Sequence, residues 1–227
     1  MSLFETVILA NGLAWASGIN LYATLAILGI FGIGGQLDLP MGLDFLENPG
    51  VIVLAVILYV IEFIADKIPA VDSIWDGIHT FIRIPAGAMI AAGMFDDVST
   101  EAQIMAFIAG GGLATVSHTF KAGTRAVINT SPEPFTNIVA SISEDILVIG
   151  GLVVALFSPT TFAVFLALFL IIAIWVIPKV FRGVRKIFNF ITGKGRKPTS
   201  TSSPMSSFHL KGDDLDRGLK EIEKNKS

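Results

Sequence analysis

The chain has 227 residues, of which 52% are hydrophobic and 15% are charged, and its mean hydropathy is +0.71. This composition excludes an ordinary soluble globular domain and indicates a protein that resides in a bilayer. The absence of cysteine excludes disulfides, thiolate metal sites and cysteine nucleophiles, and the net charge of −3 is uninformative because the charges are segregated along the chain.

Several apolar stretches are long enough to cross a bilayer as helices. A transmembrane helix needs about 20 mostly apolar residues, and five stretches supply roughly that length. They comprise residues 3–33, 49–66, 102–128, 135–157 and 160–178.

Residues 71–95 form an ambiguous sixth segment. It starts as an amphipathic helix, meets Pro85 and continues through small residues. Proline removes a backbone hydrogen bond, so we expect one span broken at Pro85, with a re-entrant pair as the alternative. The predicted fold is an all-α, polytopic transmembrane helical bundle of about six spans, covering residues 1–193.

Charge bias predicts the orientation of this bundle. Seven Lys and Arg residues follow the last span between positions 179 and 197, whereas the loop 36–48 carries only acidic charges. Basic loops stay in the cytoplasm, so the carboxyl terminus is expected inside. Counting six spans back places the amino terminus inside as well. Residues 194–227 have too few apolar groups to build a core and are predicted to be a disordered, charged cytoplasmic tail.

A short motif occurs once in each half of the chain. Gly12-Leu13-Ala14 recurs as Gly112-Leu113-Ala114, and Ser17 and Thr24 recur as Ser117 and Thr124. The match favours two inverted three-helix repeats, which is the plan of many transporters.

Two apolar segments carry charges on one side. His118, Lys121 and Arg125 share a face of the helix predicted over 102–128, and Asn137, Glu144 and Asp145 share a sector of the next. An unpaired charge at the bilayer centre costs about 2.5–3.5 kcal/mol, so these groups must be paired or face water. We expect a water-filled substrate or proton path. The alternative is a salt-bridge set that holds the two helices together.

A second polar group surrounds the end of the span 49–66. It consists of Glu62, Asp66 and Lys67, followed by Asp72, Asp76, His79 and Arg83 on one arc of the next helix. An amphipathic helix in the headgroup region gives the same pattern. In the functional interpretation, the break at Pro85 starts a half-helix whose amino end faces an anion.

The remaining polar and small positions within the spans are assigned to structure. Asn20 and Ser17 are expected to form interhelical hydrogen bonds, and Pro85 and Gly87 are assigned to helix packing. The sequence contains no nucleophile elbow, phosphate-binding loop or zinc motif. We therefore expect no cofactor, no dedicated metal centre and no nucleic-acid partner, and find no support for enzymatic chemistry.

Four runs together resemble a bacterial integral-membrane family catalogued as domain of unknown function 4126: SGINLY at 17–22, EFIADKIPAVD at 62–72, HTFKAGTR at 118–125 and SED at 143–145. The resemblance covers residues 10–180 and leaves the charged tail outside. It implies a location in the bacterial cytoplasmic membrane but no activity. It also implies that the titratable residues of the three later runs belong to the family's pattern, namely Glu62, Asp66, Lys67, Asp72, His118, Lys121, Arg125, Glu144 and Asp145.

These observations predict a small membrane transporter or permease. The fixed cations Arg83, Lys121 and Arg125 favour an anionic or phosphate-bearing solute or a lipid headgroup, with Glu144, Asp145 or His118 exchanging protons. The first alternative is a non-transporting scaffold or assembly factor with a sealed interior. The second is an enzyme acting on lipid headgroups, in which Asp66, Asp72, Asp76 and His79 serve as acid, base or transient metal ligands. Besides the bilayer, self-association is a further expectation.

Overall fold

The computed structural model describes residues 1–129 and 134–191, and all regular secondary structure in this part of the chain is helical. The predicted all-α class is confirmed. The chain divides into two compact units, 1–187 and 188–227, and the predicted tail 194–227 lies outside the described residues. The helices are α1 (Leu3–Ile19), α2 (Leu21–Ile33), the 3₁₀ helix η1 (Asp44–Glu47), α3 (Pro49–Ala65), α4 (Pro69–Gly93), α5 (Thr100–Ile128), α6 (Pro134–Phe157) and α7 (Pro159–Ile191).

Two described helices are long and apolar enough to cross a membrane, judged by length and composition. They are Phe135–Phe157, with a mean hydropathy of 2.0, and Pro159–Lys186, with 2.7. Both agree with a membrane-associated protein. The helices α1, α2 and α3 are apolar but shorter.

The expected single helix over 3–33 is wrong, because the chain leaves helical geometry at Asn20. This residue adopts an extended backbone, with φ −144° and ψ 97°. Its Oδ1 accepts the backbone N–H of Ala23 at 3.0 Å, while its own N–H donates to the carbonyl of Ala16 at 2.8 Å. Asn20 therefore caps α2 with its side chain while its backbone closes α1, which satisfies polar groups at a break in an apolar stretch.

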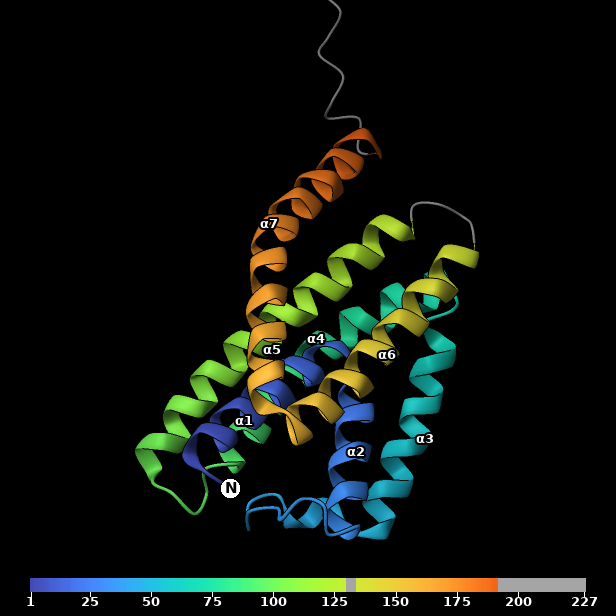
Figure 1. Ribbon diagram of the computed structural model, residues 1–227. Coiled ribbons are helices and arrows are strands. Elements are labelled where there is room, and N and C mark those ends of the chain that lie inside the picture. The colour runs from blue at the N-terminus through green and yellow to red at the C-terminus, as the bar shows by residue number, and fades with distance from the viewer. Residues whose placement is uncertain (130–133, 192–227) are drawn as a thin grey trace, which may run out of the picture. The chain divides into compact units, whose positions relative to one another are not determined.

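The break turns α1 and α2 into a helical hairpin with Asn20 at its tip. Both open ends of this hairpin lie at the same end of the helix assembly of residues 1–187 (Figure 1). Met1 and Glu5, at the start of α1, line one pocket together with Asp38, which follows α2. We call residues 1–33 the amino-terminal hairpin. The remaining helices α3 to α7 run alternately between the two ends (Figure 1).

The predicted break at Pro85 is absent, because α4 is one continuous helix from Pro69 to Gly93. The side chain of Pro85 is exposed. A proline in this position leaves one carbonyl of the preceding turn without its usual partner. The half-helix amino end that was expected at this point to face an anion is therefore not formed.

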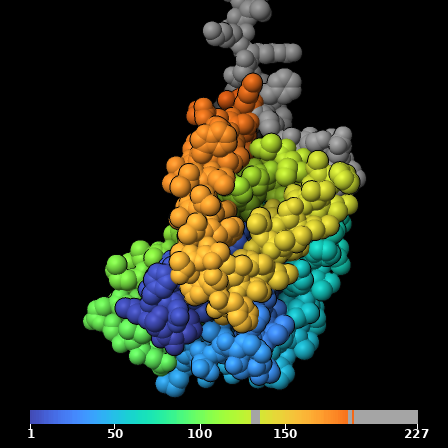
Figure 2. Space-filling view, in the orientation of Figure 1, coloured from blue at the N-terminus to red at the C-terminus, as the bar shows by residue number. Residues whose placement is uncertain are grey.

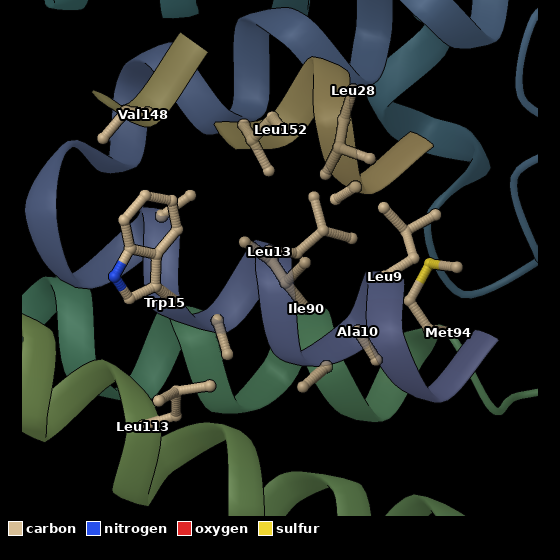
Figure 3. Packing of buried hydrophobic residues seen from close by; sticks show 14 of the residues in the cluster. Leu9, Ala10, Leu13, Trp15, Leu28, Ile90, Met94, Leu113, Val148 and Leu152 are labelled. Atoms are coloured by element: carbon tan, nitrogen blue, oxygen red, sulfur yellow. The ribbon is translucent and has the colours of Figure 1, made fainter. Parts of the chain in front are cut away.

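The apolar core surrounds α1. Leu9, Leu13 and Trp15 are at most 1% exposed. Figure 3 shows these side chains between Val148, Leu152 and Leu28 on one side and Leu113 on the other. Trp15 meets the rings of three phenylalanines of α7 edge to face, with centroids 5.2–5.8 Å apart. The most buried helix of the core therefore belongs to the amino-terminal hairpin.

Small residues allow α1, α4 and α5 to approach closely. A Cβ atom added to Gly87 of α4 would lie 2.8 Å from the Cβ of Ala114 and 3.3 Å from that of Ser17. A Cβ atom on Gly18 would collide with Ser117 and with the carbonyl of Ala114. These contacts fix the tip of the hairpin against α5 and thereby position the site described below.

The surface of the outer helices is strongly apolar. Figure 2 shows α7 and α6 on one face of the molecule. The side chains of these two helices include many large hydrophobic groups that are more than half exposed. Extensive exposed apolar surface is typical of a protein that faces lipid or a partner. Examples are Val164, Leu168, Ile171, Ile174 and Trp175 of α7 and Phe135, Ile146 and Phe157 of α6.

Candidate functional site

A buried network of charged side chains occupies the space between α3, α4, α5 and α6. Each helix contributes charges from a single face, as the spacing in the sequence predicts. Nearly all of these side chains are shielded from solvent. We define the buried ion network as Glu62, Asp66, Asp72, Asp76, Arg83, Lys121, Arg125, Glu144 and Asp145.

Arg83 joins α4 to α3. Its Nη2 lies 2.8 Å from Oε1 of Glu62, and its Nη1 lies 2.9 Å from Oδ1 of Asp76. Arg83 and Glu62 are both fully buried. A fixed, planar guanidinium suits this role, because it stays charged and holds two carboxylates in defined directions.

The ammonium group of Lys121 lies among four carboxylates. Its Nζ is 2.9 Å from Asp66, 3.4 Å from Glu62, 3.7 Å from Glu144 and 3.8 Å from Asp76. These carboxylates come from three different helices. The ammonium group of Lys121 therefore occupies the position that a small cation would take among these carboxylates. Unlike a free cation, it is covalently attached to α5.

Arg125 links α5 to α6. Its Nε and Nη2 contact both carboxylate oxygens of Glu144, with Nη2 to Oε2 at 2.8 Å. Its Nη1 donates to Oδ1 of Asn137 at 2.7 Å and to the backbone carbonyl of Asp66 at 3.2 Å. Glu144 therefore interacts with Lys121 and Arg125 together, which links the charged faces of α5 and α6.

The network contains more negative than positive groups. Its six carboxylates exceed its three fixed cations, Arg83, Lys121 and Arg125, by three formal charges. Among the described residues, Asp72 and Asp145 have no ion-pair partner; they accept hydrogen bonds from Asn129 at 2.7 Å and Asn20 at 3.1 Å. Uncompensated charge is costly in a buried site. The surplus must be balanced by protons or by cations.

Several buried oxygen atoms of the network lack a hydrogen-bond partner in the part of the chain that the structure describes. Buried polar groups are normally paired, so such atoms call for a physical explanation. They mark places where a proton, a water molecule or a cation would be stabilised. These atoms are Glu62 Oε2, Asp66 Oδ1, Asp72 Oδ1, Asp76 Oδ2 and Asp145 Oδ2.

Two histidines border the network. Nδ1 of His79 faces the carbonyl of Trp75 at 2.8 Å and must donate to it, which leaves Nε2 of the neutral ring to accept from the Tyr22 hydroxyl at 2.9 Å. Nε2 of His118 lies 2.7 Å from Oγ1 of Thr80, and its Nδ1 lies 3.3 Å from the carbonyl of Gly18. Both histidines thus contact the amino-terminal hairpin near its tip, and His118 also contacts the network, since its Nδ1 lies 3.4 Å from Nη1 of Arg83.

The other predicted site residues have different positions. Lys67 lies in the turn after α3, where its ammonium group donates to the Phe63 carbonyl at 2.8 Å and covers the Phe63 ring. Burial lowers the pKa of Lys67. The Ser17 hydroxyl bonds the Leu13 carbonyl of its own helix, so its expected interhelical hydrogen bond is not formed. Asn20 does bond another helix, through Asp145.

Three polar residues next to the network were not predicted as part of it. Tyr22 contacts His79, Thr80 contacts His118, and Asn129 donates to Asp72. Thr80 adjoins the predicted arc on α4, and Asn129 directly follows α5, so helical spacing offered a weak signal for both. The contact of Tyr22 depends on the hairpin, which no local pattern predicts.

The fold and the site together define an all-α protein with a charged interior enclosed by apolar surfaces. The chain belongs to the family described as "Domain of unknown function (DUF4126)", whose model matches residues 7–179. The resemblance noted from the sequence is thereby confirmed. Comparison with curated proteins gives no match, and neither does comparison with solved structures.

Proposed function

We propose that this protein is a multi-pass membrane permease for a small cation, coupled to proton exchange, with the buried ion network as its binding region. Five helices, α3 to α7, would cross the bilayer, and the amino-terminal hairpin would enter it from one side and return. Re-entrant helices that meet at membrane depth are typical of transporter binding sites.

The distribution of charge supports one orientation for this arrangement. The end of the bundle that holds the open ends of the hairpin carries acidic residues, and residues 1–66 contain no Lys or Arg. The opposite end carries Lys67 and the basic carboxyl-terminal part of α7. By the positive-inside rule the acidic end faces outward. This orientation places the amino terminus outside, in contrast to the position expected from counting six spans.

The buried residues change from charged to apolar at the level of Asn20. This change supports a transport path that is closed on one side. On α4 the change occurs between Arg83 and Ile90, and on α6 between Asp145 and Val148. Charged groups fill the inner half, whereas the apolar core around α1 closes the outer half. This arrangement corresponds to a site that is blocked on the outer side by the hairpin and its packing.

The charge balance favours a cation over the anion expected from the sequence. The three fixed cations of the network already bind carboxylates, whereas three carboxylate charges remain unbalanced. The outer end adds a pocket of about 420 Å³ whose lining includes Glu5, Asp38 and Asp97 and no Lys or Arg. An acidic entrance raises the local concentration of cations.

Proton exchange is the proposed source of coupling. The charge of the surplus carboxylates stays compensated during transport only if protons take the place of each cation that leaves. Asp145 is well placed for such an exchange, because it binds the hairpin tip through Asn20 and its Oδ2 atom has no partner in the described chain. His118 contacts the hairpin backbone from the other side.

The observation that carries this proposal is the contact between the hairpin tip and the carboxylate-rich network. Flux measurements in proteoliposomes would test it, with Na⁺, K⁺, Mg²⁺, Mn²⁺ and chloride as separate solutes and an internal pH dye as a second readout. We expect flux of at least one cation accompanied by proton movement, lost in Asp145→Asn. The matched control is Asp213→Asn, outside the family match.

Two outcomes would contradict the permease. No flux of any tested ion from folded protein would favour the scaffold, which the tight pairing of Arg83, Lys121 and Arg125 also permits. Flux of chloride alone would instead support the anionic substrate that the sequence predicts. Equal cation flux in Asp145→Asn and wild type would remove Asp145 from the mechanism.

A further inference from the structure

We propose that Asp66, Asp72 and Asp76 form a binding site for a divalent cation. The inference names the substrate class of the proposed permease and in that sense rests on it, but binding itself can be measured without transport. The sequence, in contrast, predicts no dedicated metal centre.

The local fold brings the three carboxylates together. Asp66 is the C-cap of α3, and its backbone N–H bonds the carbonyl of Glu62 at 2.9 Å. Asp72 and Asp76 follow in the first two turns of α4, one helical turn apart and on the same face. One oxygen from each of the three lies within 4.8 Å of the others. The short turn between α3 and α4 therefore assembles the site.

An independent observation, the pairing of individual oxygens, points to a missing positive ligand. Each carboxylate is at least 96% buried, and each has only one oxygen occupied. Asp66 Oδ2 binds Lys121, Asp72 Oδ2 binds Asn129, and Asp76 Oδ1 binds Arg83. The second oxygen of each has no partner among the described residues. Three buried anionic oxygens in this state are stabilised best by a shared cation.

The donor set selects a hard cation. All three ligands are carboxylates, and the nearby Asn129 offers an amide oxygen that also lacks a partner in the described chain. Oxygen-only sites of this kind bind Mg²⁺, Mn²⁺ or Ca²⁺ rather than Zn²⁺. Bonds of about 2.0–2.6 Å would span the observed separation after small side-chain movements.

The fixed cations next to the site would oppose metal binding. Lys121 Nζ lies 2.9 Å from Asp66 and 3.8 Å from Asp76, and Arg125 Nη2 lies 3.5 Å from Asp66. A metal ion and the Lys121 ammonium group therefore share two carboxylates. Removing this positive charge should strengthen binding at the site.

The test uses Mn²⁺ as the probe and the purified full-length protein in detergent. Electron paramagnetic resonance measures free Mn²⁺ during a titration. We expect one saturable site per chain. Asp72→Asn keeps the shape of the side chain and should weaken Mn²⁺ binding by roughly tenfold or more. Lys121→Met should bind Mn²⁺ more tightly than wild type. The control Asp213→Asn should match wild type, and size-exclusion profiles check that each variant is folded.

Other results would overturn the site. Folded wild type without saturable Mn²⁺ binding, or Asp72→Asn with wild-type affinity, would show that these carboxylates hold no divalent ion. Failure here is distinguishable from failure of the permease. Transport of a monovalent cation without Mn²⁺ binding would refute the site alone, whereas Mn²⁺ binding without any flux would refute the permease alone.

Discussion

The side-chain amide of Asn20 donates a hydrogen bond to Asp145 across 3.1 Å, although 125 residues separate the two in sequence. The same side chain caps α2 through its Oδ1 atom. One residue thus ends a helix, starts the next and ties the hairpin tip to a buried carboxylate of α6. Because α1 forms the centre of the apolar core, this contact connects the core with the buried ion network.

Replacement of Asn20 by alanine should destabilise the protein. The variant loses the cap on α2 and the partner of Asp145, at a cost of about 1–3 kcal/mol. Thermal unfolding in detergent would measure the loss as a lowered Tm. Asn11→Ala is the matched control, because the side-chain amide of Asn11 on α1 donates to the Val7 carbonyl within its own helix. Equal stability of the two variants would argue against the role of Asn20 at the tip.

Cysteine labelling should place residues 2 and 38 on the same side of the membrane. Ser2 and Asp38 are exposed at the two open ends of the hairpin, whereas Ala70 is exposed at the opposite end. The chain has no native cysteine. We expect an impermeant maleimide to label Ser2→Cys and Asp38→Cys from outside and Ala70→Cys from inside. A straight helix over 3–33 would instead separate positions 2 and 38 onto opposite sides.

Gly18 should tolerate no side chain. A Cβ atom there would meet Ser117 and the backbone of Ala114, which cannot move independently of α5. Gly18→Ala should cost about 1–3 kcal/mol through overpacking and displace the hairpin tip. Gly112→Ala on α5 is the control, since its Cβ would meet nothing within 4 Å and alanine favours a helix. A Tm of Gly18→Ala equal to that of wild type would show that α1 and α5 are packed differently.

Removing Arg83 should be worse than removing Arg83 and Glu62 together. Arg83→Gln leaves two buried carboxylates without their main partner, which typically costs about 3–5 kcal/mol. Adding Glu62→Gln removes one of these charges and should recover part of the loss. Denaturation of the single and double variants in detergent measures this difference. Arg182→Gln, at an exposed position on α7, should change little. A double variant less stable than the single one would contradict the pairing.

Local patterns predicted most of the buried ion network. Helical spacing placed His118, Lys121 and Arg125 on one face, and the structure buries all three. The cost of isolated charge in an apolar interior then required partners on neighbouring helices. The pairing of Lys121 with Asp66 at 2.9 Å, rather than mainly with Glu144, depends on how α3 and α5 approach each other. No spacing along one helix contains that information.

The helix breaks were predicted less well, because side chains outweighed backbone propensity. Pro85 lies on the exposed side of α4, where one missing hydrogen bond does not end the helix. Asn20 lies in an apolar run that reads as continuous, yet its side chain supplies the cap that makes a break inexpensive. The fold-back of α1 and α2 also depends on small residues on α5. The number of spans counted from the sequence depends on this break, and the orientation of the termini stays a prediction.

Ser141 offers a test of whether the network is reached by water. It lies on α6 between Asn137 and Asp145, is 1% exposed, and its hydroxyl has no partner in the described chain. Ser141→Cys is nearly isosteric and leaves every charge of the network in place. If the network belongs to a transport path, a cationic, impermeant thiosulfonate should label this cysteine slowly from the inner side and not from the outer side, which the apolar core around Trp15 closes. Ser117→Cys, packed between α1 and α5, should stay unlabelled from both sides. Complete protection of Ser141→Cys in folded protein would indicate a sealed ion network and would favour the scaffold over the permease.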